Sequence, residues 1–241
     1  MPVAQRKFVI LSVARSGTSL FTGSIHKHPD IYCHGEIFHP KIHEHIRNEY
    51  TNQFGIALRD HDPLGFARSV LSFSPNGEIV GFKLWHGQCP GVCDALLADP
   101  SVSKIIIERE NKLALFSSGQ LARASGIWNS QPGADISRLR GVQAGFSRQA
   151  FFAFVRRTNN TFRHYRQEAR GPVLNMSYTE IARMEFEPVL KFLGASVLPV
   201  TAMKQRLHSA DILSRYKEDC RGRILTALQR LDKLDWLRED L

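Results

Sequence analysis

A short run near the N-terminus combines a cation, hydroxyls and a glycine in an order suited to anion binding. Residues 8–13 are largely apolar, which predicts a buried central strand, and Arg15-Ser-Gly-Thr-Ser19 follows them. Gly17 permits a tight backbone turn, and the hydroxyls of Thr18 and Ser19 would lie at a helix N-terminus, where backbone amides favour an anion. The run therefore predicts a cradle for a phosphate-like group.

The same run departs from the ATP- and GTP-binding loop of P-loop proteins. That loop has a Lys directly before its Ser or Thr, and here the residue directly before Thr18 is Gly17. An ordinary ATP or GTP site is therefore not expected.

A second segment predicts another anion site. Residues 104–109 form a buried-strand pattern that ends on Arg109, and Asn111 then precedes a helical stretch that carries Ser117 and closes near Gly126. An arginine at the carboxyl end of a strand and a serine about two turns into the next helix can converge on one phosphate. The alternatives are an ion pair of Arg109 with a neighbouring glutamate, a serine bonded to its own helix, and Asn111 as a helix cap.

These segments resemble the sulfotransferases that use 3'-phosphoadenosine 5'-phosphosulfate (PAPS). Arg15-Ser-Gly-Thr-Ser19 is similar to the loop that holds the 5'-phosphosulfate in that family, and Arg109 with Ser117 is similar to its pair for the 3'-phosphate. The resemblance covers most of residues 7–130 and is to the bacterial carbohydrate branch, such as the nodulation-factor, trehalose and lipopolysaccharide enzymes. Three further stretches agree with that branch: His28-Pro29 followed by Gly35-Glu36-Ile-Phe38, Gly81-Phe-Lys83-Leu84, and Ile105 through Trp128.

The resemblance implies an α/β fold with a parallel sheet flanked by helices, like that of the P-loop nucleotide kinases. It also implies an enzyme that moves a sulfuryl group from PAPS to a hydroxyl of a carbohydrate or glycolipid by in-line displacement. Arg15 would stabilise the leaving phosphate, while the amides of Ser16 through Ser19 hold the 5'-phosphate. Because arginine and lysine would neutralise the charge that magnesium neutralises in kinases, no metal is expected.

The base that takes the acceptor proton is expected to be Glu36, because its surroundings are similar to those of the glutamate base in the bacterial enzymes. A carboxylate acts on a sugar hydroxyl only when burial raises its pKa or positioning helps it. His34 and His39 are nearby rivals, and His86 is a more distant one. Lys83 follows an apolar strand, from which it would reach donor or acceptor or extend to solvent.

Beyond residue 130 the resemblance is confined to two short stretches. Tyr178-Thr-Glu180-Ile181 is similar to a Tyr-Glu-Asp-Leu stretch of the family, and Lys204-Gln205 through Arg215-Tyr216 is similar to its C-terminal donor-covering loop. The family often has Asn where this chain has Arg215. Lys204 and Gln205 would close over the donor phosphates, with a solvated loop as the alternative.

Composition limits the possible classes of protein. A chain of 241 residues with 43% hydrophobic residues can bury one core, so residues 1–241 are expected to form a single domain. No stretch reaches the roughly 18 apolar residues of a membrane span, which predicts a soluble, cytoplasmic protein. The charge of +9 suits nucleic acid, a membrane surface or an anionic ligand. Since no nucleic-acid module is recognisable, the expected partners are the donor and a hydroxylated small-molecule or glycan acceptor.

The four cysteines are too few and too scattered for a disulfide framework, so free thiols are expected at Cys33, Cys89, Cys93 and Cys220. Cys89 and Cys93 with His86 could be considered as zinc ligands. No second Cys or His pair has matching spacing, so this alternative is not favoured.

Strands that alternate with helices predict a parallel sheet, which places ligands at the carboxyl ends of its strands. The expected strands are residues 7–13, 30–33, 79–84, 104–109 and 172–176. Residues 129–170 are expected to form an acceptor-side insertion, with a loop at 129–142 and a helix from Ser147 to Arg170. A polar loop at 197–209 and a helix over 211–237 complete the expectation.

Two rival functions remain. A nucleotide-dependent kinase or NTPase of the same fold would need a Walker lysine and a carboxylate for magnesium at a strand end, and neither is evident. A non-catalytic regulator that binds a nucleotide, or a basic nucleic-acid binder, is the other.

Overall fold

The computed structural model describes residues 6–41, 45, 56–74, 76, 78–128, 136–200 and 209–239. The chain divides into two compact units. The first comprises Met1–Glu108 and Thr161–Met203, and the second comprises Arg109–Asn160 and Lys204–Leu241. Each unit has its own core, and the expectation of a single domain over residues 1–241 stays a prediction.

The first unit is built on a five-stranded parallel sheet with the order β2-β3-β1-β4-β5. Its strands are β1 (Lys7–Leu11), β2 (Ile31–Glu36), β3 (Ile79–Leu84), β4 (Val102–Glu108) and β5 (Val173–Ser177). β1, β3 and β4 are almost entirely buried, because helices cover both faces and such strands need continuous apolar residues. All five predicted strands and the predicted fold class are confirmed.

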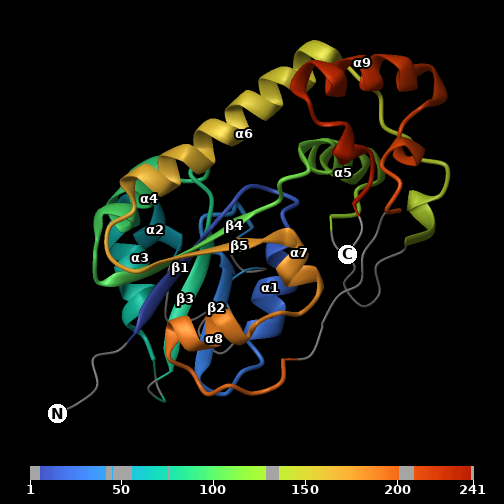
Figure 1. Ribbon diagram of the computed structural model, residues 1–241. Helices are drawn as coiled ribbons and strands as arrows, with labels where there is room; N and C mark the ends of the chain where they lie inside the picture. The colour runs from blue at the N-terminus through green and yellow to red at the C-terminus, as the bar shows by residue number, and fades with distance from the viewer. Residues whose placement is uncertain are drawn as a thin grey trace. The chain divides into compact units, whose positions relative to one another are not determined.

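Helices pack on both faces of this sheet, as Figure 1 shows, and successive residues of β1 supply the two cores. Val9 and Leu11 pack with α3 (Pro63–Ser72) and α4 (Pro90–Ala98). Phe8 and Ile10 pack on the other face with α1 (Thr18–Ile25) and α8 (Glu187–Leu193). The two remaining short helices of this unit are α2 (Ile56–His61) and α7 (Tyr178–Ala182).

The strand order creates a switch point at β1. The chain leaves β1 towards β2 on one side of the sheet and leaves the adjacent β4 towards β5 on the other side. Open parallel sheets bind ligands outside the carboxyl ends of the strands at such a point. The turn after β1, which carries the predicted anion cradle, therefore occupies the expected place for a ligand.

The second unit is helical. It contains α5 (Lys112–Ser125), α9 (Arg221–Leu231), and the 3-10 turns η3 (Ile136–Leu139), η4 (Leu213–Arg215), η5 (Glu218–Cys220) and η6 (Leu234–Leu237). The long helix α6 (Arg148–Glu168) begins in this unit, and its residues from Thr161 onward belong to the first unit. Phe151 and Val155 of α6 are buried among aromatic and aliphatic side chains of the second unit. The predicted helix over residues 147–170 is thus confirmed.

The predicted continuous helix over residues 211–237 is wrong. Only Arg221–Leu231 is α-helical, and Asp232 ends it in the left-handed conformation with φ 53°. Before it, Arg215 and Lys217 are held in a parallel bridge in which the Ala144 N–H donates to the Arg215 carbonyl and the Lys217 N–H donates to the Ala144 carbonyl. These tertiary hydrogen bonds override local helix propensity.

Two other expected segments fall partly outside the description. Residues 136–139 of the predicted loop 129–142 form the turn η3, whereas 129–135, like 201–208 of the predicted loop 197–209, lie outside the described residues. Within the described part of the chain, no helix combines the length and the apolar character needed to cross a membrane.

The close packing of β1 against β3 gives a first prediction. Phe8 pairs with Gly81 across the strands, and a Cβ on Gly81 would lie 2.5 Å from atoms of the fully buried Phe8 ring. Gly81→Ala should therefore lower the free energy of unfolding by about 1–3 kcal/mol, as overpacking does, in urea denaturation followed by circular dichroism. Gly91→Ala is the control, since a Cβ there meets nothing within 4 Å. Equal stability of the two variants would contradict this account of the β1–β3 contact.

Candidate functional site

The turn after β1 has the strained backbone that an anion cradle requires. Arg15 has φ 72° and Gly17 has φ 80°, so two of three successive residues adopt the left-handed region. That region is uncommon for a residue with a side chain and is frequent at binding sites. The strand end beneath the turn is fixed to β4, because the Ser12 hydroxyl donates to the Ile107 carbonyl at 2.6 Å. The sequence prediction of a tight turn at Gly17 is confirmed.

Gly17 is also required by a close contact with Tyr178. A Cβ at Gly17 would lie 2.7 Å from a carbon of the Tyr178 ring. Tyr178 is the first residue of α7, whose start is fixed by a capping box: the Ser177 hydroxyl accepts the Glu180 N–H, and the Glu180 carboxylate accepts the Ser177 N–H. The stretch around Tyr178, which the sequence analysis singled out, thus packs against the turn at Gly17.

The polar groups of the turn are only partly satisfied. Ser16 is fully buried, and within the described residues its Oγ has no hydrogen-bond partner. Gly17 directly precedes α1 and has no side chain to cap it, so the amides of the first helical turn, at Thr18 and Ser19, receive no side-chain acceptor from that residue. Buried polar groups normally have partners. An anion seated on this turn would supply acceptors for both the amides and the Ser16 hydroxyl.

A buried ion pair lies at the carboxyl ends of β2 and β3. Glu36 and Lys83 are register partners across these strands, and Lys83 Nζ lies 2.7 Å from Glu36 Oε1. Both side chains are nearly inaccessible, at 9% and 3% exposure. The Gln88 side-chain amide donates to Glu36 Oε2 at 2.6 Å. Both carboxylate oxygens of Glu36 therefore have a donor, which is what a buried charge requires.

Lys83 connects this pair to the turn after β1. Its Nζ lies 3.5 Å from Ser19 Oγ and 5.5 Å from the centre of the Trp85 ring. The Trp85 indole N–H is buried and has no partner among the described residues. A cation, a carboxylate and an uncapped helix start are thus gathered in one place, and they can bind an anion beside a proton acceptor. The sequence left open whether Lys83 reaches a ligand or solvent; its burial excludes the solvent-extended alternative.

The rival histidines have other surroundings. His34 is buried in β2, and His39 Nδ1 accepts the Lys41 N–H at 3.1 Å. His86 Nε2 faces Asp94 Oδ1 at 3.5 Å. Of the predicted bases, Glu36 is the one that the structure pairs with Lys83.

In the second unit, Arg109 and Ser117 each have protein partners. The Arg109 guanidinium makes a two-pronged ion pair with the Glu239 carboxylate, with Nε donating to Oε1 at 2.8 Å, and both residues are buried. Asn111 caps α5 by accepting the Ala114 N–H at 2.8 Å, so the alternative of a helix cap is confirmed. Arg109 does form an ion pair, with Glu239, which lies far from it in the sequence.

Ser117 lies beside a second buried arginine. Its hydroxyl donates to the Ala114 carbonyl at 3.0 Å, and Arg215 Nη1 donates to that same hydroxyl at 3.3 Å. Arg215, which is 4% exposed, thus adds a cation at the serine that the sequence assigned to phosphate binding. In the sequence, the indication that Arg215 could belong to the site was the similarity of residues 204–216 to a donor-covering loop. Lys204 and Gln205, the residues of that loop which were singled out, lie outside the described residues.

Comparisons with known proteins support the fold. No family model matches the chain, and no curated protein matches it significantly. Among solved structures, a sulfotransferase from Alicyclobacillus acidocaldarius is similar at 20% identity with a TM-score of 0.50, over 99% of this chain and 98% of that one. The sulfotransferase domain of the Synechococcus PCC 7002 olefin synthase has 15% identity and a TM-score of 0.44, covering 92% and 86%. A retinol dehydratase solved with androsterone and the inactive cofactor PAP has 12% identity and a TM-score of 0.42, covering 95% and 81%.

The first of these comparisons defines the class of fold. The chain has the parallel α/β fold of a solved sulfotransferase, matched along nearly its whole length. This agrees with the fold that the sequence resemblance implied.

The buried Glu36–Lys83 pair generates a prediction. Lys83→Met leaves a buried carboxylate without its cation and should lower the free energy of unfolding by roughly 3 kcal/mol. Adding Glu36→Gln, which removes the charge and keeps an acceptor for Gln88, should restore at least half of that loss in urea denaturation. Lys191→Met is the control: it breaks an exposed pair with Glu187 and should leave stability unchanged. Additive losses in the double variant would contradict the coupling of Glu36 and Lys83.

Proposed function

We propose that this protein is a PAPS-dependent sulfotransferase that moves a sulfuryl group to a hydroxyl of a carbohydrate or glycolipid. The observation that carries the proposal is the position of Lys83, buried between the Glu36 carboxylate and Ser19 in the anion-binding turn. Transfer of a sulfuryl group requires an anion site, a cation to neutralise the leaving phosphate, and an acceptor for the hydroxyl proton. Groups whose chemistry suits these three functions lie within one contact network, and this supports the proposal.

The roles of the residues follow from their chemistry. Backbone amides of Ser16 through Ser19 hold the 5'-phosphate, and Arg15 neutralises the charge that develops on it when the bond to sulfur breaks. The acceptor hydroxyl attacks sulfur in line with that bond and gives its proton to Glu36. Lys83 Nζ, 2.7 Å from Glu36 Oε1 and 3.5 Å from Ser19 Oγ, would lie beside both the carboxylate and the donor anion.

The 3'-phosphate of the donor is assigned to Arg109 and Ser117, the residues that the sequence resemblance points to. Arg215, which donates to the Ser117 hydroxyl, extends the set. For Arg109 to bind phosphate, its pair with Glu239 must open or Glu239 must reorient. Lys204 and Gln205 are assigned to cover the donor, and residues 129–170 to contact the acceptor. The assignment of Lys204 and Gln205 rests on the resemblance, and that of residues 129–170 rests on their turn-rich and helical sequence.

Donor binding can be tested separately from folding at Arg15. A side chain at φ 72° is strained, so Arg15→Gly should keep or raise the free energy of unfolding, by up to about 1 kcal/mol. The same variant should weaken binding of 3',5'-ADP at least tenfold in calorimetric titration without magnesium, because the cation is lost. The unchanged chain should bind 3',5'-ADP and show little affinity for ATP. Tighter binding of ATP with magnesium would favour the kinase alternative instead.

The 3'-phosphate assignment has its own test. Ser117→Ala removes one hydroxyl and no charge, so it should weaken binding of 3',5'-ADP by roughly tenfold and leave binding of 5'-AMP unchanged. Arg109→Ala should produce a larger loss with the same selectivity. Equal losses for both nucleotides would show that these residues do not bind the 3'-phosphate.

A further inference from the structure

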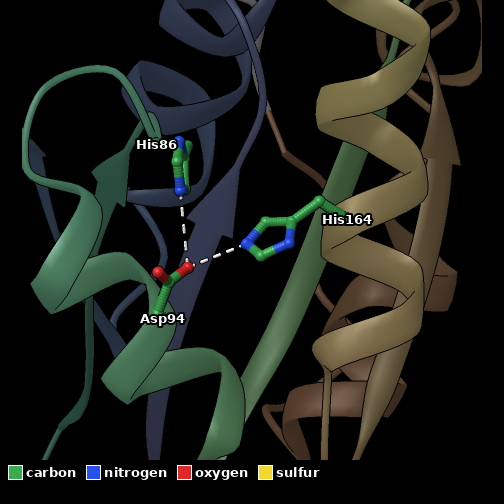
Figure 2. A group of neighbouring side chains, drawn as sticks. All are labelled: His86, Asp94 and His164. Carbon is green, nitrogen blue, oxygen red and sulfur yellow. Dashed lines mark hydrogen bonds and ion pairs between the residues drawn. The ribbon is translucent and has the colours of Figure 1, made fainter.

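Two histidine side chains of the first unit face the same carboxylate oxygen of Asp94, and the three residues come from different elements. Figure 2 shows His86 from the loop after β3, Asp94 from α4 and His164 from α6. His164 Nε2 lies 2.8 Å from Asp94 Oδ1, and His86 Nε2 lies 3.5 Å from the same oxygen. The two imidazole rings are 5.0 Å apart, centre to centre, and the ligand atoms of all three residues lie within 4.8 Å of one another.

The two nitrogen–oxygen distances are compatible with ligands of one metal ion. Zinc binds imidazole nitrogen and carboxylate oxygen at about 2.0 Å, so two such ligands in a tetrahedral site lie about 3.3 Å apart. The two nitrogen–oxygen distances here, 2.8 and 3.5 Å, fall on either side of that value. Small side-chain rotations would therefore bring all three ligands onto one ion.

The ligand atoms that meet here are nitrogen and oxygen. Cys93, next to Asp94, is buried in the core and is not one of the three residues whose ligand atoms lie close together. His86, Asp94 and His164 are themselves 35–50% exposed, which leaves a path for an ion and room for water at a fourth position. The sequence analysis considered His86 together with Cys89 and Cys93 as zinc ligands. In the structure, the residues whose ligand atoms lie near those of His86 are Asp94 and His164 instead.

We propose that His86, Asp94 and His164 form a binding site for a divalent transition cation of the zinc class, separate from the residues assigned to sulfuryl transfer. Two histidines and one carboxylate with an open position are a ligand set that such ions prefer. These three ligands are far apart in the sequence, so no motif with a fixed spacing predicts the site.

The site has a structural consequence for the loop between β3 and α4. Gln88, two residues after His86, donates to Glu36. The His86 N–H donates to the Tyr165 hydroxyl at 2.9 Å, and that hydroxyl donates to the Ser12 carbonyl at 3.1 Å. An ion that joins His86 to α4 and α6 would therefore hold the loop that orients Gln88.

The test uses Co2+ as a spectroscopic probe and Zn2+ as a competitor, with the full chain carrying no histidine tag. We expect one Co2+ per chain, with visible absorption of a nitrogen- and oxygen-ligated ion that Zn2+ abolishes. Asp94→Ala and His164→Ala should each weaken Co2+ binding at least about tenfold. His39→Ala is the matched control, because His39 lies 4.5 Å, ring centre to ring centre, from His45 and offers the alternative histidine pair.

Thermal unfolding provides a second measurement that does not depend on activity. At free Zn2+ one hundred times the dissociation constant of the unchanged chain, the transition midpoint should rise by roughly 5–10 °C, and in Asp94→Ala the rise should fall to about half or less. Absence of Co2+ binding would overturn the proposal and leave the cluster as a hydrogen-bonded His–Asp–His group. Binding that is lost only in His39→Ala would overturn it as well, by placing the ion elsewhere.

Discussion

The contact between Lys83 and Glu36 is the constraint on which the arrangement of the first unit depends. Removing a lysine and a glutamate from water costs several kcal/mol each, and only close pairing and further hydrogen bonds recover that cost. The sheet meets this demand by placing β2 beside β3 in the register that sets Glu36 opposite Lys83. Gln88 then satisfies the second carboxylate oxygen. The loop after β3 and the end of β2 are thus fixed by the electrostatics of one pair.

The turn after β1 illustrates how local strain is tolerated when its surroundings are rigid. Arg15 keeps an unfavourable φ because β1 is a central strand with neighbours on both sides, and because Ser12 is bonded to β4. Tyr178 closes the space at Gly17 in which the turn would otherwise relax. Strain of this kind is common where a protein must present backbone amides to a ligand. Here it lies beside the Ser16 hydroxyl, which has no hydrogen-bond partner in the described part of the chain.

The fold was largely predictable, and the site only in part. Apolar runs locate every strand of the sheet, because a parallel strand buried on both faces cannot alternate with polar residues. Helix α5 was recognisable from its caps at Asn111 and Gly126. The partner of Arg109 was not, because Glu239 is 130 positions away and nothing local distinguishes it from a surface glutamate. The contact between Asp94 and His164 was not predictable either, because only the packing of α4 and α6 brings these distant residues together.

The division of the chain has a consequence for how the protein is made. Residues 109–160 are inserted between β4 and the segment that holds β5, so the ribosome must add 64 residues after Glu108 before β5 begins at Val173. At typical rates of synthesis this takes roughly 3–13 s. Throughout that interval β4, with its isoleucines at 105–107, is an unpaired sheet edge of the kind that promotes aggregation. During synthesis there is therefore a period in which the apolar strand β4 lacks its partner β5.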